Sequence, residues 1–136
     1  MMRMPVAYGA ALIVFCVLDF GWLSVMGPRL YKPALGELMG AEVRPLAAIA
    51  FYAIYLFGLV FFAVRPALAG QSWITAAQNG AVLGLVAYAT YDLTNQATLR
   101  LWSVKVTVLD LAWGVLVSGL TATISYVVTA RFVRSV

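Results

Sequence analysis

The chain has 136 residues, of which 64% are hydrophobic and only 10% are charged, and its mean hydropathy is +0.96. Soluble domains carry about one quarter charged residues, so the composition excludes an ordinary soluble domain and indicates an integral membrane protein. The net charge of +4 does not indicate a nucleic-acid ligand, because the nine basic residues are scattered over the ends of apolar runs, where they suit interfacial anchors.

Four apolar runs, at about 5–26, 45–64, 73–91 and 106–130, are each long enough to cross a hydrocarbon core about 30 Å thick. Because backbone groups must be paired within lipid, we predict an all-α integral membrane four-helix bundle. The bundle would be a single transmembrane domain over residues 1–136. Since four helices alternate in direction, the N- and C-termini are expected on the same side of the membrane.

The first run follows Arg3, as in a secretory signal. It is long, however, and it ends in "DFGWLSVMGP" rather than in a small-residue cleavage site, so we interpret it as a retained helix. Cys16 has no second cysteine with which to pair and is interpreted as a small packing residue.

Three of the five acidic residues lie within or beside the apolar runs. Asp19 lies just inside the end of the first run, Asp92 lies at the end of the third, and Asp110 lies shortly after the start of the fourth. A carboxylate at membrane depth costs a few kcal/mol and usually faces the bundle interior or water. Alternation of the helices brings all three to the same side of the membrane, so we predict that they converge there.

The second and third runs add polar and aromatic residues to this side. Tyr52 and Tyr55 lie at about the depth expected for Asp19. In the third run a near i, i+4 spacing predicts one shared helix face, which carries Gly80, Gly84, Tyr88, Asp92 and Asn95. The two glycines allow a close helix contact, so a homo-oligomer through Gly80 and Gly84 is one expectation.

A short phrase occurs twice, as "VLDFGW" at 17–22 and as "VLDLAW" at 108–113. The three-residue spacing puts Asp19 with Trp22, and Asp110 with Trp113, on one face of each helix. The two helices run in opposite directions, as the inverted repeats of transporters do. Six residues do not establish a duplication, and chance or simple convergence is the favoured explanation of the phrase.

Each aspartate also has a structural interpretation. Asp110 suits the positive end of a helix dipole, and Asp92 suits an Asx-type turn that closes its own loop. For Asp19 the natural alternative is an ion pair with a nearby base, either Arg29, Arg44 or Lys105.

The phrases "LDFGWL", "YDLTNQATLRLW" and "VTVLDLAWGVLVS" resemble an uncharacterised family of small bacterial four-helix membrane proteins, a catalogued domain of unknown function. The resemblance covers nearly the whole chain and implies no activity. It does imply an association with genes for fatty-acyl modification, which favours a lipid-related role only slightly. Its motif positions in this chain are Asp19, Trp22, Tyr91, Asp92, Thr94, Asn95, Asp110 and Trp113.

With no histidine and one cysteine, the chain has no catalytic triad, haem ligand or ordinary zinc site. We predict no cofactor and no metal. The favoured function is the binding of a membrane lipid or another amphiphile in an interfacial acidic and aromatic pocket of a multi-pass inner-membrane protein. The protein would assist or catalyse lipid modification, with Asp19, Asp92 and Asp110 as candidate acids or bases.

The alternatives are a small transporter coupled to protons or cations, and an assembly partner of another membrane protein. The predicted ligand-binding residues are Asp19, Trp22, Arg44, Tyr52, Tyr55, Tyr88, Tyr91, Asp92, Asn95, Lys105, Asp110 and Trp113.

Overall fold

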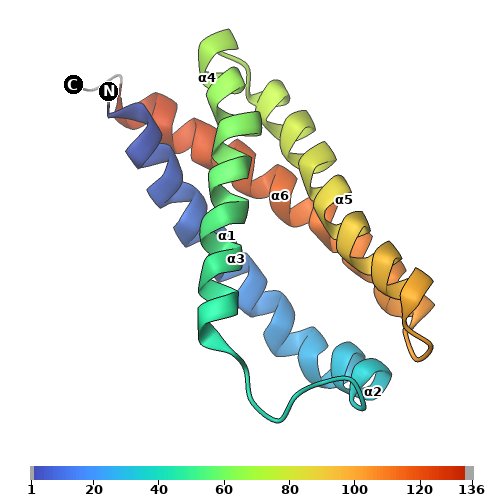
Figure 1. Cartoon of the computed structure of the whole chain (residues 1–136). Coiled ribbons are helices and arrows are strands. Elements are labelled where there is room, and N and C mark those ends of the chain that lie inside the picture. Colours follow the sequence, from blue (N-terminus) through green and yellow to red (C-terminus); the bar gives the residue numbers. More distant parts are fainter. Residues whose placement is uncertain (1, 134–136) are drawn as a thin grey trace.

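The computed structural model describes residues 2–133, which form four long helical segments running alternately up and down (Figure 1). The first combines α1 (Arg3–Met26), a π-helical turn (η1, Gly27–Tyr31) and α2 (Lys32–Leu35). The second combines α3 (Pro45–Leu59), a further π-helical turn (η2, Val60–Val64) and α4 (Arg65–Gly70). The third is α5 (Trp73–Thr98) and the fourth is α6 (Val104–Phe132).

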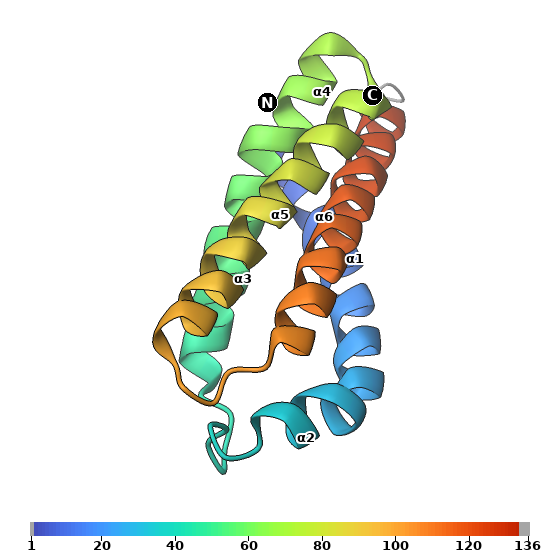
Figure 2. The ribbon, with the colours of Figure 1, turned by 90° about the vertical axis from the view of Figure 1, so that its right-hand side faces the viewer.

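The prediction of an all-α four-helix bundle is confirmed for the described residues. Three segments are long and apolar enough to span a membrane, namely 3–35, 45–70 and 104–132. α5 is the less apolar fourth helix, because polar residues such as Gln78, Asn79 and Asp92 interrupt it. α5 nevertheless packs closely against α6 at Gly80 and Gly84. The start of α1 lies at the same end of the bundle as the end of α6 (Figures 1 and 2).

Small residues hold α5 against α6. A Cβ atom added to Gly84 would lie 2.1 Å from the backbone oxygen of Gly114, and one added to Gly80 would lie 2.7 Å from that of Ser118. Side chains cannot be accommodated at such distances, so the two glycines allow this close approach, as small residues do in other membrane helices. The face that we expected to form a homo-oligomer is therefore occupied by α6 of the same chain.

Prolines do not end the first two segments. Pro66 lacks the N–H that would bond to the carbonyl of Phe62, four residues earlier, and the side chain of Asn79 in α5 donates to that carbonyl instead (3.1 Å). The first segment likewise continues through Pro28 and Pro33 by way of the π-helical turn Gly27–Tyr31. Backbone groups freed in lipid need such partners or local adjustments.

Three predicted helix ends fall short: the second segment continues past residue 64 to Gly70, and the other two errors bear on the site. The first helical segment does not end near residue 26 but continues to Leu35, so that Tyr31 lies in a helix and not in a loop. The third helix does not end near residue 91 but at Thr98, which places Asp92 well inside α5. An Asx-type turn at Asp92 is therefore excluded, because the residue has helical neighbours on both sides.

Candidate functional site

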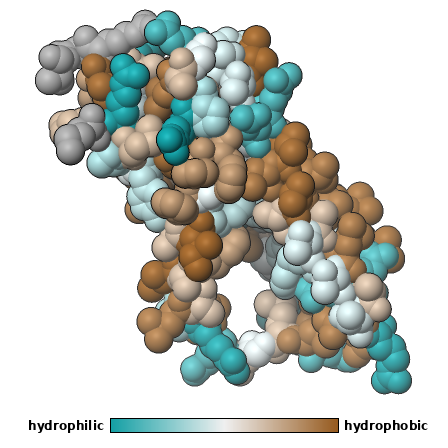
Figure 3. All heavy atoms as spheres, turned by 45° about the horizontal axis from the view of Figure 1, so that its top comes forward, coloured by the Kyte–Doolittle hydropathy of each residue, from teal (hydrophilic) through white to brown (hydrophobic). Residues whose placement is uncertain are grey.

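A pocket of about 440 Å³ lies in the half of the bundle nearest the α5–α6 connection. It is bounded by residues of all four segments, and a hollow is visible between them in the space-filling view (Figure 3). Six of its lining side chains are aromatic, two are carboxylic acids and two are aliphatic: Trp22, Tyr31, Phe51, Tyr88, Tyr91, Trp113, Asp19, Asp110, Leu23 and Ala87.

The two tryptophans of the repeated phrase meet at the pocket. Trp22 of α1 and Trp113 of α6 stack with their ring centroids 4.5 Å apart and their planes 7° from parallel. α1 and α6 are antiparallel, so the two copies face each other about the stacked rings. The two copies of the repeated phrase are therefore in contact in the folded protein, which their sequences alone did not establish.

The aspartate of the first copy is held by neutral donors. Asp19 is buried, with 8% of its surface exposed. The hydroxyl of Tyr52 in α3 donates to one carboxylate oxygen, and the indole N–H of Trp113 lies 3.4 Å from the other. The hydrogen-bond partners of Asp19 are thus a phenol and an indole from two other helices, whereas the ion pair considered from the sequence required a base.

The aspartate of the second copy has a matching arrangement. Asp110, 6% exposed, accepts a hydrogen bond from the hydroxyl of Tyr31, and that hydroxyl accepts one from the indole N–H of Trp22 (2.8 Å). Each aspartate is therefore bonded to one tyrosine, and each tryptophan reaches toward the aspartate of the other copy. The bond to Tyr31 gives Asp110 a partner beyond the helix dipole.

Asp92 lies behind Asp110 and does not line the pocket. It is fully buried, and neither of its carboxylate oxygens has a donor in the described structure. Its acidic neighbour is Asp110, and the described structure holds no hydrogen bond from Asp110 to either oxygen of Asp92. Because an ionised carboxylate only accepts hydrogen bonds, the two groups can bond to each other only when one of them carries a proton.

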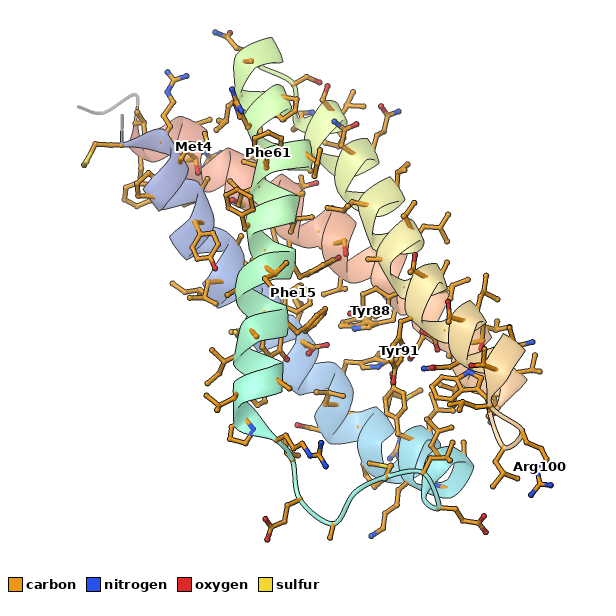
Figure 4. All side chains as sticks on the ribbon, in the orientation of Figure 1. Met4, Phe15, Phe61, Tyr88, Tyr91 and Arg100 are labelled. Atoms are coloured by element: carbon orange, nitrogen blue, oxygen red, sulfur yellow. The ribbon has the colours of Figure 1, made fainter. Side chains whose placement is uncertain are left out.

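The aromatic wall on the α5 side comes from Tyr88 and Tyr91, which project from α5 toward α1 and α3 (Figure 4). Tyr88 packs directly over Gly114 of α6, where an added Cβ atom would come within 2.4 Å of the ring. Tyr88 also meets the ring of Tyr55 edge-on at a centroid distance of 6.4 Å. Gly114 thus creates the space in which the Tyr88 ring lies.

The structure brings together most, but not all, of the residues predicted to bind a ligand. Six of them line the pocket, and Tyr52 and Asp92 support its aspartates from behind. Tyr55 lies deeper, where its hydroxyl is bonded to that of Ser118, and Asn95 lies beside Tyr91. Arg44 and Lys105 are exposed and lie outside the pocket lining, so the expectation that they hold a head group there has no structural basis.

Tyr31 is the most important site residue that the sequence did not reveal. It follows Trp22 by nine residues, about two and a half turns of α-helix, which would place the two on opposite faces. The intervening π-helical turn changes this register, because each of its turns contains more residues. Leu23, Phe51 and Ala87 were also missed, since isolated apolar residues in an apolar helix carry no distinguishing signal.

Among residues 2–133, no group of three carboxylate, cysteine or histidine side chains is arranged so that it could hold a metal ion. The chemistry available at the pocket is that of two carboxylic acids, phenols and indoles.

The comparisons with known proteins give a family but no function. No curated protein matches the chain, and no solved structure matches it. A family model does match residues 4–127, and thus all four helical segments. The chain therefore belongs to the family described as "Predicted membrane protein (DUF2177)".

Proposed function

We propose that the protein binds an amphiphile, with the polar end of the ligand beside Asp19 and Asp110 and its apolar part against the aromatic wall. The observation that carries this proposal is the composition of the pocket, in which an almost wholly apolar lining ends in two buried carboxylic acids. Ligand sites typically combine a volume of about 300–1,000 Å³ with a few placed polar groups, and about 440 Å³ falls within that range.

The position of the pocket favours a ligand that enters from the bilayer. Three of its lining residues are substantially exposed, namely Leu23, Phe51 and Tyr91, so the pocket is open to the surroundings of the bundle. A molecule dissolved among lipids would meet these side chains without crossing the helix bundle. We therefore favour a membrane lipid or a similar amphiphile over a water-soluble ligand.

In this proposal the protein is a multi-pass protein of a bacterial inner membrane that assists or carries out modification of a lipid. Helical spans, rather than closed strand barrels, suit that membrane. If a reaction takes place, Asp19 and Asp110 are the acids that line the pocket and can pass a proton to or from the ligand, and Asp92 is a buried acid next to Asp110.

A variant that fills the pocket tests this proposal. Ala87 lines the pocket, so Ala87→Phe would occupy part of its volume, whereas Ala112 is exposed on α6 and outside the lining, so Ala112→Phe is the matched control. Native mass spectrometry of protein purified in mild detergent should show a bound lipid in the parent and in Ala112→Phe but not in Ala87→Phe. Equal retention by both variants would contradict binding in this pocket.

A row of buried hydroxyls favours the runner-up function, which is proton or cation transport. Ser118, Thr121, Ser125 and Thr129 are all fully buried along α6, on the side of the bundle beyond the pocket. Most of these hydroxyls are already engaged: that of Ser118 with Tyr55, that of Ser125 with a carbonyl of α1, and that of Thr129 with a carbonyl of its own helix. Proton and cation fluxes in proteoliposomes decide between the two functions, since measurable flux would favour transport.

A further inference from the structure

The described lining of the pocket contains acids but no base. Asp19 and Asp110 line it, and Asp92 lies fully buried behind Asp110. The groups that donate to the two lining acids are neutral phenols and indoles. Buried charge is costly unless it is paired. The ionised form of these two acids therefore needs a partner of opposite charge, which a cationic ligand can supply.

The walls of the pocket suit a cation as well. The faces of tryptophan, tyrosine and phenylalanine rings attract ammonium groups through their quadrupoles, and cages of such rings recognise quaternary ammonium ligands. Trp22, Trp113, Tyr88, Tyr91 and Phe51 all line the space next to the two carboxylic acids. An anionic head group, by contrast, would meet the two lining acids and no lining base.

We propose that the amphiphile bound here carries a cationic ammonium head group, either a primary or a quaternary one. The proposal rests on the proposed function and specifies its ligand class. The ammonium group lies between Asp19 and Asp110 against the tryptophan pair, and the apolar chain leaves the pocket past Phe51 and Leu23.

The net charge of the protein cannot account for a preference for an ammonium head group. The chain carries a net charge of +4, so nonspecific attraction at its surface favours anionic amphiphiles. A preference for an ammonium head group must therefore come from a local site.

The test uses three probes with the same bromine-labelled twelve-carbon chain, which quenches tryptophan fluorescence on contact. Their head groups are trimethylammonium, uncharged maltoside and sulfate. The protein carries Trp73→Phe and Trp102→Phe, so that Trp22 and Trp113 are the remaining fluorophores. Each probe is titrated into the protein in an unlabelled maltoside detergent, and the concentration that gives half-maximal quenching is compared.

We expect the ammonium probe to quench at a concentration about tenfold or more below that of the maltoside probe. Asp19→Asn and Asp110→Asn should each reduce this ratio severalfold, since the amide oxygen still accepts from the tyrosine while the charge is gone. Glu42→Gln removes an exposed acid from the α2–α3 loop and should leave the ratio unchanged. Circular dichroism confirms that each variant is folded.

The outcomes separate the two proposals. Equal quenching by all three probes, or a preference for sulfate, overturns the cationic head group and leaves amphiphile binding in place. Absence of saturable quenching by every probe overturns amphiphile binding itself. An ammonium preference that survives in both aspartate variants also overturns the inference, because the carboxylates would then not be its cause.

Discussion

Asp92 provides a sharp test of whether the acids serve a ligand or hold the fold together. Its carboxyl group is fully buried, its two oxygens have no donor, and its neighbour Asp110 is also an acid. In Asp92→Asn the amide N–H can donate to Asp110, so one acceptor gains a partner and one buried acid is removed. An unsatisfied buried polar group costs about 1–3 kcal/mol. We therefore expect Asp92→Asn to stabilise the protein by about that amount, with a rise in Tm of several degrees.

The measurement is thermal unfolding in detergent, followed by circular dichroism, together with reversible unfolding in mixed micelles. Asp92→Leu has a similar volume and no polar atoms, and it should be at least neutral, as replacements of buried ionic groups often are. Glu42→Gln, on an exposed loop, should change the free energy of unfolding by less than about 0.5 kcal/mol. A loss of more than about 1 kcal/mol in Asp92→Asn would refute the reasoning, because it would mean that the carboxylate makes a stabilising bond. The same loss would favour the structural interpretation of the acids.

Three further substitutions test other parts of the site and fold. Gly114→Ala should cost about 1–3 kcal/mol of unfolding free energy and weaken amphiphile binding, because the new methyl group displaces the Tyr88 ring. Gly119→Ala is the control and should cost far less, since the nearest atom to a Cβ added there is 3.4 Å away. Tyr31→Phe removes the donor to Asp110 and should destabilise by about 1–3 kcal/mol, with a change in the fluorescence of the tryptophan stack. Asn79→Leu leaves the carbonyl freed by Pro66 without its donor and should cost about 1 kcal/mol, which unfolding in mixed micelles would detect; an unchanged stability would mean that the carbonyl needs no partner there.

The convergence of the acids could be predicted because it depends on few facts. Four apolar runs determine the number of helices, and alternation then places the ends of the first and third runs beside the start of the fourth. Asp19 and Asp110 meet at one pocket for this reason, and the spacing of three residues brings Trp22 and Trp113 with them. These features follow from helix periodicity and direction, which do not depend on side-chain detail.

The helix ends were predicted wrongly where the course of the backbone differs from what local composition indicates. The first apolar run ended near residue 26, but a π-helical turn lets the helix continue through Pro28 and Pro33 and brings the hydroxyl of Tyr31 to Asp110. The polar residues after Tyr91 indicated the end of a helix, but α5 continues to Thr98, whose hydroxyl donates to the carbonyl of Thr94 within the helix. The positions of Arg44 and Lys105 depended on the course of loops and helix ends, for which the sequence has no comparable signal.

The most direct test of the central claim is an experimental structure of the protein in lipid nanodiscs that contain phosphatidylethanolamine, whose head group bears a primary ammonium. We predict elongated density in the pocket, with its compact end between Asp19 and Asp110 and its extended part passing Phe51 toward the bilayer. A pocket that contains only isolated water density, or that closes by contact of Tyr88 and Tyr91 with α1 and α3, would contradict the claim.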